Sequence, residues 1–206
     1  KVIDTALSTD NLGSMTAVGS TLYFSATTKT QGRELWKSDG TAAGTVIVTD
    51  LFPGTVGSSP SYLTAVGSTL YFAAQDPAAG LELLKSDGTA AGTVVVKDII
   101  SGRTEGSFPS GFVTLGGTLL FAAGTPLSGS ELWKSDGTAA GTTLLADIAA
   151  GSADSFPTNL TVVGTTVYFL ASSTGSGARR DLWKTDGTSA GTVLVATLNV
   201  ATATGF

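Results

Sequence analysis

The chain has 206 residues, a formal net charge of −5 and a pI near 4.5. This acidic balance argues against a nucleic-acid-binding protein, because phosphate backbones are bound through clustered Lys and Arg side chains. Cysteine and histidine are both absent, which excludes disulfides and thiol chemistry and removes the side chains used by most catalytic triads and zinc sites.

The predicted elements are clearest between residues 60 and 98. Runs of apolar and β-branched residues bounded by turn residues predict strands at 61–66, 69–74, 81–86 and 93–98. Gly67-Ser68 predicts a two-residue hairpin turn, and residues 87–92 predict the turn before the fourth strand. Helical periodicity is absent and the apolar runs are far shorter than the roughly 20 residues that span a bilayer, so we expect neither helices nor membrane insertion.

This unit recurs four times. Its motif, ELWKSDGTAAGT, begins at Glu34 and returns with small changes at Glu82, Glu131 and Asp181, a spacing of 48 to 50 residues. Four short antiparallel strands in such a unit are typical of a β-propeller blade. We therefore predict a single all-β domain over residues 1–206, a β-propeller of four blades with repeat units at about 5–50, 51–98, 99–147 and 148–197.

Two alternative architectures stay open at this point. One is a part of a larger propeller, and the other is a β-solenoid, which the tight hairpin turns disfavour because solenoid strands are usually parallel. Within a unit, the second strand is apolar on both faces, as in Leu70-Tyr71-Phe72, and should be covered from both sides. The third strand alternates, as a strand nearer the edge of a sheet would.

The chain ends carry a further ambiguity. The fourth strand ends in Asp50, Asp98 or Asp147 in three units, whereas Thr197 stands there in the last unit and Asp4 supplies a matching Asp near the N-terminus. One interpretation is ring closure, in which the first residues complete or flank the last sheet. The other is that the chain was cut from a longer array of the same unit.

The motif Glu-Leu-Trp-x-x-Asp-Gly-Thr-x-x-Gly-Thr resembles the ELWxxDGT repeat of large secreted or surface-attached bacterial proteins, a family loosely called hyalin-like. The match covers all four units, although Leu84 replaces Trp in the second and Asp181 and Thr185 replace Glu and Ser in the fourth. The resemblance implies a bacterial extracellular or cell-surface location and an adhesive or scaffolding role. It implies no activity for individual residues.

Each motif contains one turn Asp, which is Asp39, Asp87, Asp136 or Asp186. A Ca²⁺ loop gathers several carboxylates within about a dozen residues, so a single carboxylate in each turn favours a structural turn over a metal site. We expect these side chains to accept backbone N–H bonds and to hold the third strand against the fourth. The sequence predicts no metal and no cofactor.

Trp36, Trp133 and Trp183 occupy one position of the unit, which would suit a platform that stacks on sugars. Large aromatic side chains at fixed blade positions more often pack between blades, and Leu84 fills the same position in the second unit. Packing is therefore favoured, and a multivalent carbohydrate-binding, lectin-like propeller is the alternative function.

A carboxylate pair for glycoside hydrolysis is the remaining catalytic option. Propeller glycosidases place their acids around the central opening, on or near the innermost strands. The predicted innermost strands, 14–18, 62–66, 112–115 and 159–163, contain no carboxylate. We therefore expect no catalytic residues and no enzyme.

Only two loops of the unit vary in length, the second-to-third and the fourth-to-first connections. In a propeller both lie on one face, here called the variable-loop face, and variation on one face of a fixed scaffold suits a binding surface. The sequence thus predicts a non-enzymatic extracellular module with a structural, adhesive or protein-interaction role, whose partner is a protein or glycan of the cell surface or matrix. The candidate partner-binding residues are Lys29, Gln31, Arg33, Gln75, Asp76, Arg103, Glu105, Asp154, Arg179 and Arg180.

Overall fold

The computed structural model of the chain describes residues 12–102, 105–175 and 180–198. In this part of the chain sixteen strands form four antiparallel sheets of four strands each, which confirms the predicted all-β architecture. The described residues include no helix long and apolar enough to cross a membrane.

Each sheet is one repeat unit, and we call the sheets blades 1 to 4. Blade 1 contains β1 (Met15–Val18), β2 (Thr21–Thr28), β3 (Gly32–Ser38) and β4 (Val46–Thr49). Blade 2 contains β5 (Ser61–Val66), β6 (Thr69–Asp76), β7 (Gly80–Ser86) and β8 (Val94–Lys97). Blade 3 contains β9 (Ser110–Leu115), β10 (Thr118–Thr125), β11 (Gly129–Ser135) and β12 (Thr143–Ala146). Blade 4 contains β13 (Thr158–Val163), β14 (Thr166–Ala171), β15 (Asp181–Thr185) and β16 (Val193–Ala196).

Within a blade the strands follow one another as a meander, so each strand pairs with its neighbours in sequence. The first hairpin of blade 2 is closed by Gly67-Ser68, because Val66 pairs with Thr69 and leaves two residues for the turn. Gly67 has a φ of 60°, a left-handed conformation that glycine adopts without strain and that matches the twist of the strands.

The blades pack face to face through shared apolar clusters. The cluster between blades 1 and 2 contains the buried residues Tyr23, Leu35, Val48, Leu63, Leu70, Phe72, Ala74 and Leu84. Blades 2 and 3, and blades 3 and 4, use the corresponding positions. We call the face of a blade that packs on the next blade its forward face, and the face that packs on the preceding blade its rear face.

The third strand of a blade is more buried than its alternating pattern predicts. Leu35 on the forward face and Glu34 on the rear face are both fully buried. Leu35 packs in the cluster shared with blade 2, and Glu34 binds residues of the connection to blade 2. β3 is also an interior strand, between β2 and β4. The edge strands of each sheet are its first and its short fourth strand.

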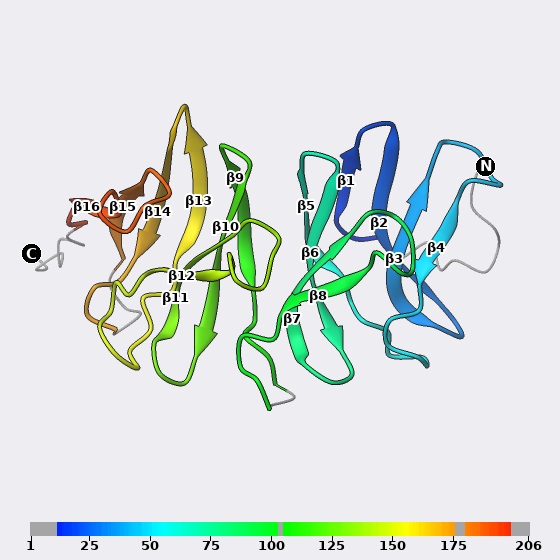
Figure 1. Ribbon diagram of the computed structural model, residues 1–206, viewed down its shortest axis with the longest axis horizontal. Coiled ribbons are helices and arrows are strands. Elements are labelled where there is room, and N and C mark those ends of the chain that lie inside the picture. Colours follow the sequence, from blue (N-terminus) through cyan, green and yellow to red (C-terminus); the bar gives the residue numbers. More distant parts are fainter. Residues whose placement is uncertain (1–11, 103–104, 176–179, 199–206) are drawn as a thin grey trace, which may run out of the picture.

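The four blades form an open array along the longest axis of the molecule (Figure 1). The innermost strands are in contact in sequence order, β1 with β5, β5 with β9 and β9 with β13. Blades 1 and 4 lie at opposite ends of the array in Figure 1, so the described residues do not close a four-bladed ring. The arrangement is that of consecutive blades of a larger propeller, which was one of the predicted alternatives.

Candidate functional site

The motif turns are held by their own side chains. In blade 2, Asp87 Oδ1 accepts hydrogen bonds from the Thr89 amide at 2.8 Å and from the Thr89 hydroxyl at 2.7 Å. The Thr89 hydroxyl oxygen in turn accepts a bond from the Gly92 amide at 2.9 Å. The Thr89 hydroxyl and amide lower the pKa of the Asp87 carboxyl, because both bonds favour the charged form.

The turns of the other blades repeat this pattern around Asp39, Asp136 and Asp186. All four carboxylates are exposed, and the described residues contain no group of three or more acidic side chains that could hold a metal ion. Each turn also closes against its strands through a hydroxyl pair, such as Ser86 with Thr93 at 2.8 Å.

A buried glutamate opens each of the first three motifs, and sequence reasoning gave it no role. Glu82 is fully buried, and its carboxylate accepts hydrogen bonds from the Ser107 amide at 2.9 Å and the Ser107 hydroxyl at 2.6 Å. Burial raises the pKa of Glu82 to about 7, although the bonds from Ser107 act in the opposite direction. Since Ser107 lies just before β9, this pair ties blade 2 to the start of blade 3.

The same carboxylate-to-serine pair joins the other blades. Glu34 accepts bonds from the amide and hydroxyl of Ser58, and Glu131 from those of Ser155. Burial raises the pKa of both glutamates. The signal in the sequence was the spacing itself, because a Ser stands 24 or 25 residues after each Glu and two residues before a Pro.

A second inter-blade contact uses a lysine and a tyrosine on the forward face. Lys85 Nζ donates a hydrogen bond at 2.9 Å to the carbonyl oxygen of Gly137, in the motif turn of blade 3. The Tyr71 hydroxyl lies against the same glycine, so closely that a Cβ on Gly137 would be 2.0 Å from it. Burial, together with the nearby charge of Asp136, raises the pKa of Tyr71.

Blades 1 and 2 are joined by the same contact. Lys37 Nζ donates to the carbonyl oxygen of Gly88 at 2.8 Å, and a Cβ on Gly88 would be 2.2 Å from the Tyr23 hydroxyl. Both tyrosine hydroxyls thus fill the space beside the motif turn of the next blade.

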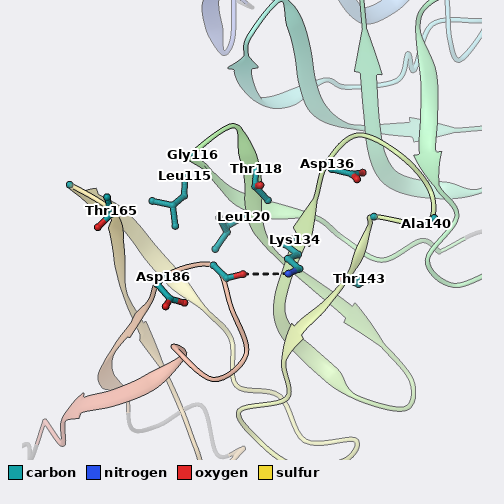
Figure 2. Close-up of a pocket in the computed structure, with 13 residues that line it drawn as sticks. Leu115, Gly116, Thr118, Leu120, Lys134, Asp136, Ala140, Thr143, Thr165 and Asp186 are labelled. Carbon is teal, nitrogen blue, oxygen red and sulfur yellow. Dashed lines mark hydrogen bonds between the residues drawn. The ribbon is translucent and has the colours of Figure 1, made fainter.

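The contact between blades 3 and 4 differs, because Leu120 stands where Tyr23 and Tyr71 stand in blades 1 and 2. A pocket of about 830 Å³ opens there, with Leu115, Leu120, Lys134 and Gly187 among its lining residues. Figure 2 shows Lys134 reaching across the pocket to the Gly187 carbonyl oxygen, a bond lengthened to 3.4 Å. The pocket thus lies where the shorter Leu120 replaces the tyrosine found at the other two interfaces.

The tryptophans lie on the rear faces of their blades. Trp133 is 7% exposed and belongs to the cluster between blades 2 and 3. Trp183 packs, partly buried, on the cluster between blades 3 and 4, and Trp36 packs on Phe24 and Ala26. Their positions favour packing over a sugar platform.

Of the candidate partner-binding residues that the structure describes, Lys29, Gln31, Glu105, Asp154 and Arg180 lie in connections, whereas Arg33, Gln75 and Asp76 lie at the ends of strands β3 and β6. Glu105 and Asp154 line one groove of about 310 Å³ together with Phe108 and Pro126. Asp76 accepts bonds from the amides of its own loop, and Arg180 donates to the Thr158 hydroxyl at 2.6 Å. Arg103 and Arg179 lie outside the described residues. Lys29, Gln31 and Arg33 belong to the β2–β3 hairpin of blade 1. Gln75 of blade 2 lies near Arg33, because the Gln75 amide donates to the Ser58 carbonyl and the Ser59 amide donates to the Arg33 carbonyl.

Apolar side chains at the loop tips were not predicted. Four of them are exposed on the variable loops: Val56 at 74%, Phe108 at 60%, Leu127 at 86% and Phe156 at 38%. Phe108 and Phe156 each precede a proline and have φ values of 54° and 48°, a left-handed conformation that is costly for a bulky residue. The fold thus holds two large aromatic side chains outward in a strained conformation.

No known protein-family profile matches the chain, and no curated protein matches it by sequence. Solved structures do match. The chain is similar to a puromycin hydrolase, with a TM-score of 0.61 and 17% identity over 93% of this chain and 30% of that one. It is also similar to prolyl endopeptidases, with a TM-score of 0.58 and 15% identity over 89% of this chain and 25% of that one.

A third match is TolB from Acinetobacter baumannii, with a TM-score of 0.52 and 12% identity over 92% of this chain and 44% of that one. The chain has the β-propeller fold. It spans between a quarter and somewhat under half of the length of these proteins. At such identities the similarity establishes the fold and leaves activity undecided.

Proposed function

We propose that this chain is a non-enzymatic binding module of a bacterial extracellular or cell-surface protein, and that it binds a protein partner through the variable-loop face. The extracellular location rests on the resemblance of the repeated motif. The binding role is supported by the distribution of exposed apolar side chains.

The observation that carries the proposal is the apolar character of the variable loops. Phe108 and Leu127, from two adjacent connections of blade 3, are more than half exposed. Solvent-exposed aromatic and aliphatic side chains that gather on one face are typical of an interaction surface. The motif turns at the opposite ends of the strands carry Asp, Gly, Thr and Ala, and the exposed apolar residues beside them are the smaller Val46, Val94 and Val193.

The groove beside Phe108 indicates the chemistry of the partner. Glu105 and Asp154 contribute carboxylates to it, while Ile100, Phe108 and Pro126 supply apolar surface. A segment with alternating basic and apolar side chains would complement both features. We therefore expect an extended, basic peptide segment of a protein partner.

A catalytic role has less support. Glu34, Glu82 and Glu131 are the buried carboxylates with raised pKa values, a property that often marks catalytic acids. Each of them, however, uses both oxygens to bind the serine of the next blade or neighbouring amides. These carboxylates serve the joining of blades.

The test is selection from a phage-displayed peptide library on the immobilised chain, followed by affinity measurement on the selected peptides. We expect selected peptides to be enriched in Lys, Arg and apolar residues. The double variant Phe108→Ser and Leu127→Ser should weaken their binding at least tenfold.

The matched control is Val94→Ser, since Val94 is 41% exposed but begins β8, next to a motif turn. Val94→Ser should leave peptide binding unchanged. Equal binding by all three proteins would contradict the proposal. A parallel glycan array tests the lectin-like alternative, which would be favoured by glycan binding that Trp183→Ala abolishes without loss of thermal stability.

A further inference from the structure

The pocket between blades 3 and 4 can be compared with the same positions at the two preceding inter-blade interfaces of this chain. At the two preceding interfaces, a tyrosine of the forward face extends to the motif turn of the next blade, where its hydroxyl meets Gly88 or Gly137. Leu120 ends short of the corresponding Gly187, whose Cβ position has only Leu115 nearby, at 3.5 Å. A tyrosine ring fills this space at the first two interfaces, whereas at the interface between blades 3 and 4 the space is empty.

Three groups that lie near the Tyr71 hydroxyl have counterparts at the third interface. Lys134 corresponds to Lys85, Gly187 to Gly137, and Asp186 to Asp136. Figure 2 shows Leu115 and Leu120 near each other and Lys134 beside Leu120, with Asp136 and Asp186 at the two motif turns. The pocket therefore combines an apolar wall with a lysine and a backbone carbonyl.

We propose that this pocket binds a phenolic ring, which takes the place of the missing tyrosine side chain. The ring lies on Leu115 and Leu120, and its hydroxyl approaches Lys134 and the Gly187 carbonyl. The hydroxyl can donate to the carbonyl oxygen and accept from the ammonium group. Such a hydroxyl would also offer Lys134 a closer partner than the carbonyl oxygen at 3.4 Å.

The chemistry is shared by a free para-alkyl phenol and by a tyrosine side chain of a partner peptide, so the experiment has two arms. In the first, p-cresol is titrated into the isotope-labelled chain and followed by NMR. We expect shifts for residues around Leu115, Thr118 and Gly187, with a dissociation constant of about 1 mM, reasonable for a ligand of this size. In the second arm, a short peptide with a central Tyr is compared with its Phe counterpart.

The matched variant is Leu120→Tyr, which restores the side chain found in blades 1 and 2. It should raise the melting temperature and abolish the shifts caused by p-cresol. Lys134→Met, which keeps the pocket open, should weaken binding of p-cresol at least threefold but leave binding of toluene unchanged. Absence of p-cresol shifts in the wild-type chain, or shifts that persist in Leu120→Tyr, would overturn the proposal. Tighter binding of the Tyr peptide than of p-cresol identifies a peptide as the source of the ring.

The two outer faces of the array carry an independent inference. Val195, on the forward face of blade 4, is 45% exposed, whereas its counterparts Val48, Val96 and Leu145 are 8%, 6% and 4% exposed. On the rear face of blade 1, Leu22 is 39% exposed, whereas Leu70, Leu119 and Val167 are fully buried. These two faces have the composition of an inter-blade interface, and no blade formed by the described residues covers either of them.

The residues that make the polar contacts of an inter-blade interface are also present on these two faces. Blade 4 has Tyr168 and Lys184 at the positions of Tyr71 and Lys85. Blade 1 has Gly40 at the position of Gly137, with open space at its Cβ position, beside an apolar groove lined by Leu12, Met15, Leu22 and Phe24. The forward face of blade 4 is therefore complementary to the rear face of blade 1.

We infer that these faces bind each other between two copies of this chain, blade 4 of one copy on blade 1 of the next. The contact is head-to-tail, since it joins two different surfaces. In sedimentation equilibrium at a chain concentration of about 100 μM, we expect a mass of at least twice 20.6 kDa. This concentration is above the micromolar dissociation constants that are typical of modest interfaces.

Two variants separate this contact from any other association. Leu22→Lys and Val195→Lys each remove one face, and each alone should be monomeric. Mixed in equal amounts they should form a 1:1 pair, because the intact blade 4 of the first variant meets the intact blade 1 of the second. A wild-type monomer at all concentrations, or variants that associate like the wild type, would overturn the inference.

Discussion

Glu82 in blade 2 and Ser107 in the connection to blade 3 lie 25 residues apart, yet both the amide and the hydroxyl of Ser107 donate to the Glu82 carboxylate. The carboxylate is fully buried, and its burial raises the pKa of Glu82 to about 7. The glutamate that opens each of the first three motifs therefore connects two blades and, because it is buried, has a raised pKa.

The first prediction concerns pH. A raised pKa in the folded state means that folding favours the protonated form, so this contribution to stability is full below about pH 4.5 and is lost as pH rises through about 7. We expect the free energy of unfolding of the wild type to fall over this window. Glu82→Gln, which cannot ionise, should show a smaller fall in urea unfolding series at pH 5, 6, 7 and 8.

At acidic pH the turn aspartates give the free energy of unfolding the opposite dependence on pH. The lowered pKa values of Asp39, Asp87, Asp136 and Asp186 mean that their stabilisation is present above their ordinary pKa of 3.8 and is lost as pH falls below it. Maximum stability should therefore lie near pH 4 to 5. A maximum at pH 7 or above would contradict the role assigned to the buried glutamates.

The second prediction uses glycines of the motif turns as a matched pair. Gly40 and Gly137 have φ values of 93° and 87°, so alanine at either costs about 1–2 kcal/mol of backbone strain. Only at Gly137 would the new Cβ also collide with the Tyr71 hydroxyl. In thermal unfolding, Gly137→Ala should destabilise more than Gly40→Ala, and Tyr71→Phe should recover part of the difference. Equal losses would show that the tyrosine moves freely.

The third prediction concerns the lysine of the motif. Lys85→Met keeps the aliphatic stem and removes the hydrogen bond to the Gly137 carbonyl, which should cost about 1.5–3 kcal/mol in the free energy of unfolding. Lys29→Met is the control, because Lys29 is exposed on a loop and should change stability by less than about 0.5 kcal/mol. A loss no larger than that of the control would mean that the bond adds nothing to blade packing.

The fourth prediction distinguishes a structural turn from a cation site. Asp87→Ala removes the acceptor of both Thr89 bonds and should lower the melting temperature, while leaving peptide binding at the variable-loop face intact. Addition of Ca²⁺ should shift the melting temperature of neither protein. A Ca²⁺-dependent rise in the wild type that Asp87→Ala abolishes would instead establish a metal site at the turn.

The sequence by itself determined the blade. The period of the motif, the paired glycine turns and strands such as Leu70-Tyr71-Phe72 depend on local conformational preferences and on side-chain alternation, both of which act within one unit. The strand at Ser61–Val66 was accordingly predicted to the residue. The second strand was predicted too short, since β6 continues through Gln75 and Asp76. These polar residues end the apolar pattern, but they still pair with Leu81 and Gly80 of β7.

The tertiary structure decided what each residue of the repeat does. Burial of Glu82, the reach of Lys85 to Gly137 and the vacancy beside Leu120 all depend on the face of a second blade, and no pattern within one unit states how blades are stacked. The open array was also beyond the sequence, because the same inter-blade surfaces serve a closed ring and a longer one equally well. Hydrophobic patterning specifies that a face is covered, whereas only the packing of whole sheets specifies by what.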